Sequence, residues 1–114
     1  MGSEPTANLQ SRLGAIASAV KPVCERHPLL RRLYLFGSRA RGSERPGSDY
    51  DFYAELDHSA CERALPQYLS IIDGLESALS SRIDFVSGEA WNARDALLKE
   101  EIERDKVLLY DRDA

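Results

Sequence analysis

One stretch of the sequence decides the expected fold: residues 35–51 read LFGSRARGSERPGSDYD. The apolar and aromatic run 32–36 ends abruptly at Gly37-Ser38, and such a short run is typical of a buried strand. A short helical turn over 39–41 is predicted to follow it. Residues 42–48 are mostly turn-forming types and predict a loop. The stretch therefore predicts a strand, a turn of helix and a loop that leads into a second strand, 49–56.

Apolar and polar side chains alternate along this second strand. Tyr50, Phe52, Ala54 and Leu56 occupy the even positions, and the odd positions begin with two aspartates. Because successive side chains of a strand point to opposite faces, the even positions should face the core. The odd positions should face away from it. Asp49 and Asp51 would then project from one face, about 6.6 Å apart along the strand.

The rest of the chain alternates between helical and strand-like patterns. Apolar residues recur at three- and four-residue spacing in the amphipathic helices, and Pro22 is expected to bend or shorten the first of them. Pro66 is tolerable only if the second helix starts near Ala64. The remaining elements are helices over 7–23, 60–79 and 92–104 and strands over 82–86 and 106–110. This order predicts an α/β (α+β) fold, a mixed sheet covered by helices.

Length and composition predict one domain. The 114 residues suit a single domain over 6–114 after a disordered start, residues 1–5. Apolar residues make up 43% of the chain, and no apolar run approaches the roughly 20 residues of a membrane span. The N-terminus lacks a signal-peptide pattern, so we expect a cytoplasmic protein with no membrane partner. Cys24 and Cys61 should be reduced, buried thiols, and His27 and His58 surface or capping residues.

The charge is unevenly distributed. The net charge of -4 argues against direct nucleic-acid binding through long-range electrostatics. Arginines nevertheless gather in one stretch, and acids dominate from Asp49 onward. The basic stretch could hold a small polyanion, or it could be a solvated face. Its members are Arg26, Arg31, Arg32, Arg39, Arg41 and Arg45.

Residues 35–51 contain two devices for holding a nucleoside triphosphate. Glycine lets the backbone approach a ligand closely, and the amides after Gly37, with the Ser38 hydroxyl, could bind phosphate oxygens. Asp49 and Asp51 are two close carboxylates, and Mg²⁺ prefers carboxylate ligands together with substrate phosphates. Each device alone is weak evidence, since an Asp-x-Asp pattern is commonly surface charge.

Together the two devices are more specific. Gly37-Ser38, ten residues and then Asp49-x-Asp51 resembles the signature of nucleotidyltransferases related to DNA polymerase beta. In chain length and in the sequence of this motif, the chain is most similar to the minimal nucleotidyltransferase (MNT) family, whose members pair with helical HEPN proteins. The resemblance extends to Asp84, in Arg-Ile-Asp-Phe-Val, and to Lys-Val-Leu-Leu-Tyr110. It covers residues 30–110.

The resemblance implies roles for particular residues. Gly37 and Ser38 would bind the triphosphate of ATP, and Asp49 and Asp51 would ligate Mg²⁺. Asp84 would complete the metal site and could act as general base toward the acceptor hydroxyl. The loop arginines Arg39, Arg41 and Arg45 could offset phosphate charge, although solvated arginines are an equal alternative.

The resemblance also implies a function. The chain would be an antitoxin that transfers AMP from ATP to a hydroxyl, a tyrosine for preference, of a HEPN ribonuclease toxin. One alternative is a nucleotidyltransferase subunit that acts on a small molecule such as an aminoglycoside. Another is a non-catalytic module that neutralises its partner by binding. The presence of all three carboxylates argues against the last, because a pure binder has no need of them.

Overall fold

The computed structural model describes residues 5–57, 59, 64–87 and 96–114. Four helices and four strands alternate along these segments in the expected order, with a four-residue helix after the first strand. The fold class is therefore confirmed. In chain order the elements are α1 (Pro5–Arg26), β1 (Leu30–Phe36), α2 (Ser38–Arg41), β2 (Tyr50–Leu56), α3 (Ala64–Leu79), β3 (Ile83–Ser87), α4 (Ala96–Asp105) and β4 (Val107–Asp111).

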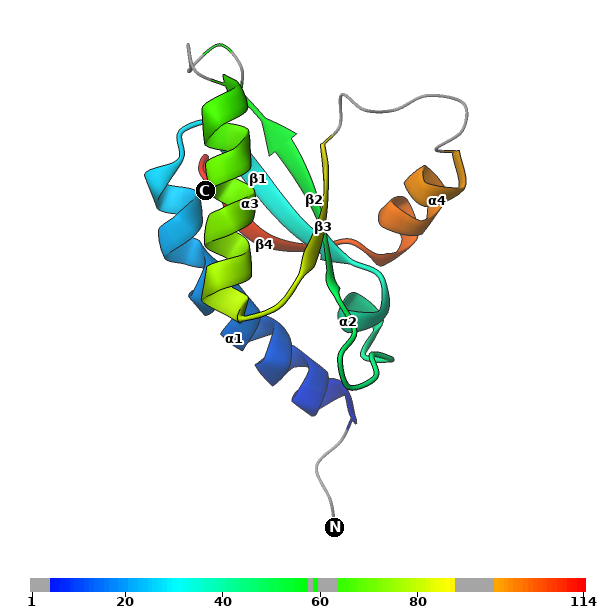
Figure 1. Cartoon of the computed structure of the whole chain (residues 1–114). Coiled ribbons are helices and arrows are strands. Elements are labelled where there is room, and N and C mark those ends of the chain that lie inside the picture. Colours follow the sequence, from blue (N-terminus) through cyan, green and yellow to red (C-terminus); the bar gives the residue numbers. More distant parts are fainter. Residues whose placement is uncertain (1–4, 58, 60–63, 88–95) are drawn as a thin grey trace.

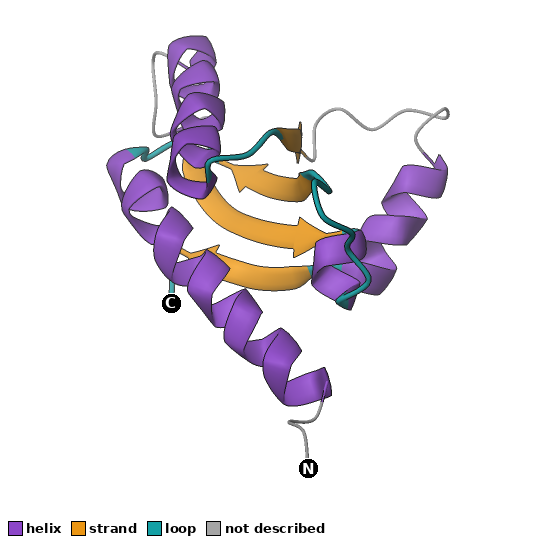
Figure 2. Cartoon of the chain, turned by 60° about the horizontal axis from the view of Figure 1, so that its bottom comes forward, coloured by secondary structure: helices purple, strands orange, loops and turns teal. Residues whose placement is uncertain are grey.

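The strands form one mixed sheet in the order β3-β2-β1-β4. Strand β1 runs antiparallel to both β2 and β4, whereas β2 and β3 are parallel and joined through α3. Helices α1 and α3 pack side by side against one face of the sheet (Figures 1 and 2). Helix α4 lies apart from them, beside α2 (Figure 1). Among the described residues, α1 and α3 thus cover one face of the sheet, and α4 lies over part of the other.

The predicted alternation along β2 is confirmed. Phe52 and Ala54 are fully buried, and their partners across β1, Leu35 and Leu33, are fully buried too. Asp51, one position from Phe52, is only half-buried. The four buried side chains of β1 and β2 named above, without Asp51, face α1 and α3, which supply most of the remaining core. The other fully buried large side chains are Val20, Cys24, Leu29, Leu30, Ile71, Leu75 and, at 1% exposed, Ile102.

Both ends of α1 differ from their predictions, and the predicted helix starts at residues 60 and 92 lie outside the described residues. Helix α1 begins at Pro5, a position where proline is favoured because the first helical N–H groups have no partner within the helix. It also continues past Pro22 to Arg26, so Pro22 does not end it. Val20 and Val23 on either side of Pro22 are buried, and their burial stabilises the last turn. Helix α3 starts at Ala64, as Pro66 requires.

The end of α1 is held by polar contacts. His27 is buried, with Nδ1 2.7 Å from the Val23 carbonyl and Nε2 2.9 Å from the Ser70 hydroxyl. Since a carbonyl only accepts, Nδ1–H donates and Nε2 accepts from Ser70 of α3. His27 is therefore a cap and not a surface residue. Burial raises the pKa of the nearby Cys24 thiol to about 12, which keeps it a protonated, unreactive thiol. Cys61 and His58 lie outside the described residues.

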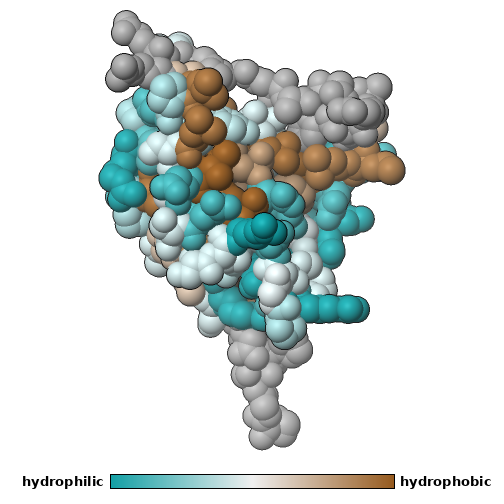
Figure 3. Space-filling model, in the orientation of Figure 1, coloured by the Kyte–Doolittle hydropathy of each residue, from teal (hydrophilic) through white to brown (hydrophobic). Residues whose placement is uncertain are grey.

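A few large apolar side chains stay exposed. They lie on α3, α4 and β4, and Figure 3 shows apolar surface over α3 and α4. Single exposed leucines are ordinary on soluble domains. None of the helices in the described part of the chain combines the length and the apolar character that a membrane span requires. The exposed residues are Leu65, Leu69, Leu97 and Leu108.

Candidate active site

The turn after β1 is built around Gly37. Its φ of 78° and ψ of −158° are accessible to glycine and strained for other residues. A β-carbon at Gly37 would collide with the Asp51 carboxylate, whose Cγ lies 3.1 Å from the position that this atom would take. Phe36 is the register partner of Asp51 across β1 and β2. Glycine is therefore required at this position so that the Asp51 carboxylate can lie against the turn that carries Ser38.

Asp51 and Asp84 lie side by side. They are register partners on the parallel strands β2 and β3. Burial and the adjoining Asp84 carboxyl raise the pKa of Asp51 to about 6, with smaller contributions from the charges of Glu101 and Asp49. Two carboxylates this close repel each other, so the pair either retains one proton or needs a cation beside it. The predicted meeting of Asp51 and Asp84 is thus observed.

Asp49 occupies a different position from the one its pattern predicts. Strand β2 begins at Tyr50, so Asp49 is the last loop residue, and it is exposed. Its charge still acts on Asp51. Within the described residues, no three or more His, Cys, Asp or Glu side chains are arranged as a metal-binding cage. The structure therefore shows a carboxylate pair with a third acid near it, and not a closed triad.

A fourth acid, Glu101, faces the pair from α4. It lines a cavity of about 330 Å³ together with Asp51 and Asp84. The other lining residues are Phe36, Phe85, Val86 and Leu98. Sequence reasoning missed Glu101. Its signal was present, because Leu98 and Ile102 define the inner face of α4 at helical spacing and Glu101 lies on that face.

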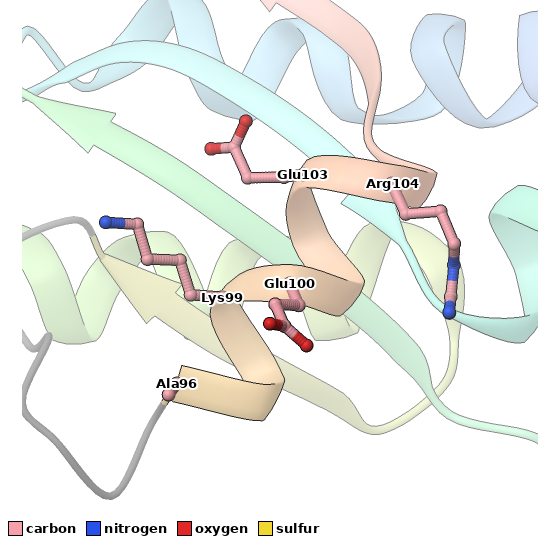
Figure 4. Close-up of a pocket in the computed structure, with 5 residues that line it drawn as sticks. All are labelled: Ala96, Lys99, Glu100, Glu103 and Arg104. Atoms are coloured by element: carbon pink, nitrogen blue, oxygen red, sulfur yellow. The ribbon is translucent and has the colours of Figure 1, made fainter.

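The outer face of α4 carries four other charged residues of this helix. Figure 4 shows Lys99, Glu100, Glu103 and Arg104 extending from α4, with the sheet behind it and α1 and α3 behind the sheet. These residues and Ala96 line a surface hollow. It lies on the outside of α4, whereas Glu101 lines the acidic cavity. The cavity between α4 and the sheet, which holds the acid pair, is therefore the candidate site.

Arg41 links α2 to α4. Its Nη1 lies 2.5 Å from Asp105 Oδ2 and 3.6 Å from Glu101 Oε2. Arg104 donates two further hydrogen bonds to Asp105, at 2.9 and 3.0 Å. Arg104, and Arg41 beside it, hold the pKa of the Asp105 carboxyl below its usual range. Arg41 thus lies at the rim of the cavity, where it already has two carboxylate partners.

The Arg39 side chain contacts the loop before β2 and does not line the acidic cavity. Its Nε and Nη2 both donate to the Ser48 carbonyl oxygen, at 3.1 and 2.8 Å. Its guanidinium also lies over the Tyr50 ring, 4.0 Å from the ring centroid. Arg45 is exposed in the loop, where its backbone N–H donates to the Ser48 hydroxyl. Arg39 and Arg41, the two arginines of α2, therefore have separate partners and do not form one phosphate-binding cluster.

Comparison with known proteins gives this geometry a family. The family model "Polymerase beta, Nucleotidyltransferase" matches residues 18–114, which include the serine turn and all the acids above. The chain belongs to this nucleotidyltransferase family. A solved structure described as a "putative minimal nucleotidyltransferase" is 32% identical, with a TM-score of 0.62 over 87% of this chain and 93% of its own. The resemblance of the sequence to minimal nucleotidyltransferases is thereby confirmed.

Two further relatives carry a stated activity or partner. A Methanocaldococcus jannaschii protein named "putative protein adenylyltransferase" is 27% identical in an alignment of 97 positions that covers 79% of this chain and 94% of the relative. The MNT antitoxin fold also matches, in a structure of a tri-AMPylated Shewanella oneidensis HEPN toxin in complex with MNT antitoxin. That likeness has a TM-score of 0.60 and 18% identity, over 89% of this chain and 74% of the other. It shows a shared fold.

Proposed function

We propose that this chain is an antitoxin that transfers AMP from ATP to a hydroxyl, for preference a tyrosine, of a HEPN-type toxin. The observation that carries the proposal is the Asp51–Asp84 pair, which lines a cavity of about 330 Å³ and whose Asp51 carboxylate lies against Gly37. The relatives support the choice of AMP and of a protein acceptor. One is named a protein adenylyltransferase, and another was solved with a tri-AMPylated toxin.

The acidic cavity fits a Mg²⁺ ion that enters with ATP. Mg²⁺ keeps several waters and is usually held by one or two carboxylates plus substrate phosphates. The adjoining carboxylates of Asp51 and Asp84 supply that donor set, and we propose that Asp49 joins them when the ion and ATP are bound. The raised pKa of Asp51 indicates the same need, because a carboxylate pair without a cation tends to retain a proton. When bound, the ion would neutralise charge on the triphosphate.

The remaining work falls to residues of the chain itself. Ser38 and the backbone beside Gly37 would hold the triphosphate so that its α-phosphorus faces the acceptor. The hydroxyl oxygen of the acceptor then attacks that phosphorus, and the bond to the pyrophosphate oxygen breaks. The hydroxyl proton passes to a carboxylate of the cavity, for which Asp84 is our candidate. Positioning of this kind accounts for much of the catalysis in phosphoryl transfer.

Mass spectrometry of the partner tests the proposal. A helical HEPN-type protein is produced as the candidate partner, purified, and incubated with this chain, ATP and Mg²⁺. We expect the partner to gain one or more AMP units, and Asp51→Asn to abolish the gain. Asp73→Asn, which makes the same change at an exposed position of α3, should leave it intact.

Two outcomes would contradict this function. A partner that is inhibited yet unmodified would show neutralisation by binding alone. AMP transfer to an aminoglycoside, with the protein partner unmodified, would show a small-molecule enzyme. Full transfer by Asp51→Asn would remove the acid pair from the mechanism.

A further inference from the structure

The side chain of Arg39 brackets Asp49. Two of its nitrogens donate to the carbonyl oxygen of Ser48, the residue before Asp49. The same guanidinium lies on the ring of Tyr50, the residue after it, 4.0 Å from the centroid. Contacts on both sides restrict how the backbone at Asp49 can turn. Asp49 precedes the first residue of β2, so the sheet alone does not determine its direction.

Tyr50 gives Arg39 a fixed platform. Its ring stacks on Phe52, with centroids 6.2 Å apart and planes 6° from parallel. Phe52 is fully buried in the core. Stacking and cation–π contact with a tyrosine favour arginine over lysine, because the guanidinium is planar and donates in a fork. The rings of Tyr50 and Phe52 thus connect the Arg39 guanidinium to the core and restrict its position.

The Arg39 guanidinium lies on the side of the sheet away from the acid pair. It lines a hollow of about 210 Å³ with Tyr50 and with Arg12 and Ile16 of α1. Tyr50 is one position from Asp51 in β2, so the two side chains project from opposite faces. A triphosphate held beside Asp51 and Asp84 would be on the other face. This placement disfavours direct phosphate binding by Arg39, the role that its sequence position suggested.

The loop has further anchors that do not involve Arg39. Arg12 forms an ion pair with Glu44, joining α1 to the start of the loop. The Ser48 N–H donates to the Arg45 carbonyl at 2.9 Å, and the Arg45 N–H donates to the Ser48 hydroxyl at 2.9 Å. These contacts should survive a change at Arg39. Such a change should therefore alter the direction of the Asp49 side chain while the loop keeps its conformation.

We propose that Arg39 is a positioning residue that fixes Asp49 toward the metal and triphosphate, and that it is not a phosphate ligand. Arg39 follows Ser38 directly in α2. The two hydrogen bonds from its guanidinium to the Ser48 carbonyl oxygen therefore connect the serine turn to the loop that ends at Asp49. The proposal rests on the proposed function, because it assumes that Asp49 helps to hold a divalent ion with ATP.

Metal and nucleotide binding, measured separately, distinguish positioning from phosphate binding. We would use Mn²⁺ titrated calorimetrically in the presence of AMP-PNP, and AMP-PNP alone in EDTA. Arg39→Lys keeps the charge and loses the fork. We expect it to weaken Mn²⁺ binding roughly tenfold, about the effect of one charge-assisted hydrogen bond. AMP-PNP binding in EDTA should change less than about twofold. Arg45→Lys, at an exposed arginine of the loop that follows α2, is the matched control and should leave both unchanged.

A second readout needs no ligand. Amide hydrogen exchange over 47–51, measured in metal-free protein, should be faster in Arg39→Lys and unchanged in Arg45→Lys. Tyr50→Phe keeps the ring and should behave as wild type, whereas Tyr50→Leu should resemble Arg39→Lys in both exchange and Mn²⁺ affinity. These results would support positioning even if no AMP transfer were found.

Other results would overturn the inference. Wild-type Mn²⁺ affinity in Arg39→Lys would exclude positioning through the fork. So would an Arg39→Gln variant that loses AMP-PNP binding in EDTA while Arg39→Lys retains it, because that pattern indicates a charge contact with phosphate. A failure of wild-type transfer contradicts the proposed function instead, and the binding and exchange measurements still decide the role of Arg39.

Discussion

Replacing Asp51 by asparagine should stabilise the metal-free protein. The pKa of Asp51 is raised from 3.8 to about 6 by burial and by the Asp84 carboxyl. Ionised Asp51 therefore costs the folded state free energy that the unfolded state does not pay. A shift of about two units corresponds to at most about 3 kcal/mol. Because Asp51 is half-exposed and screened by solvent, roughly 1.5 kcal/mol is the expected gain.

The gain should depend on pH in a defined direction. A carboxyl whose pKa is higher in the folded state loses protons there only as the pH rises toward 6. Wild-type stability should therefore fall between about pH 4 and pH 7 through this group, and the Asp51→Asn difference should grow over the same window. Near pH 4 and below, the variant should have little or no advantage.

Urea unfolding followed by circular dichroism in EDTA, at pH 4 and pH 7.5, measures this difference. A separate thermal unfolding experiment at pH 7.5 should give a midpoint for Asp51→Asn that is roughly 5 °C above that of the wild type, for a chain of this length. Asp73→Asn controls for the general loss of one negative charge. A variant that is no more stable than wild type at pH 7.5, or a gain of equal size at both pH values, would refute the assignment of Asp51 to a repelling pair.

Three further changes test other parts of the site and fold. Gly37→Ala should abolish AMP transfer and lower stability by at least about 1 kcal/mol, since a β-carbon there meets Asp51 at a strained positive φ; AMP transfer and urea unfolding measure both, and normal activity would contradict the geometry. Ser38→Ala should weaken AMP-PNP binding by less than about tenfold, through loss of one phosphate contact; unchanged affinity in calorimetry would remove Ser38 from the site. Arg112→Ala should cost about 2 kcal/mol in urea unfolding, because Arg112 donates to three main-chain carbonyl oxygens at and after the end of α1; a loss below about 0.5 kcal/mol would contradict that role.

Local sequence determined the elements and much of the acid site. The alternation from Tyr50 to Leu56 predicted which face of β2 is buried, because a strand with one buried face must place its apolar side chains at every second position. Pro66 predicted the start of α3, since only a first turn tolerates proline. Gly37 and Asp51 were expected at the site from their motif and Asp84 from the family resemblance, and the structure places Gly37 and Asp84 each beside Asp51.

Only the tertiary structure decided which side chains meet across the sheet and between helices. The parallel register of β2 and β3 places Asp84 beside Asp51, and no local pattern encodes a pairing between segments more than thirty residues apart. Glu101 reaches the cavity because α4 packs over that edge of the sheet, and Arg39 turns toward Tyr50 because the core holds that ring. Residue type and spacing set what each side chain can do. Packing of the whole chain sets which partner it has, because burial and charge act through space and not along the sequence.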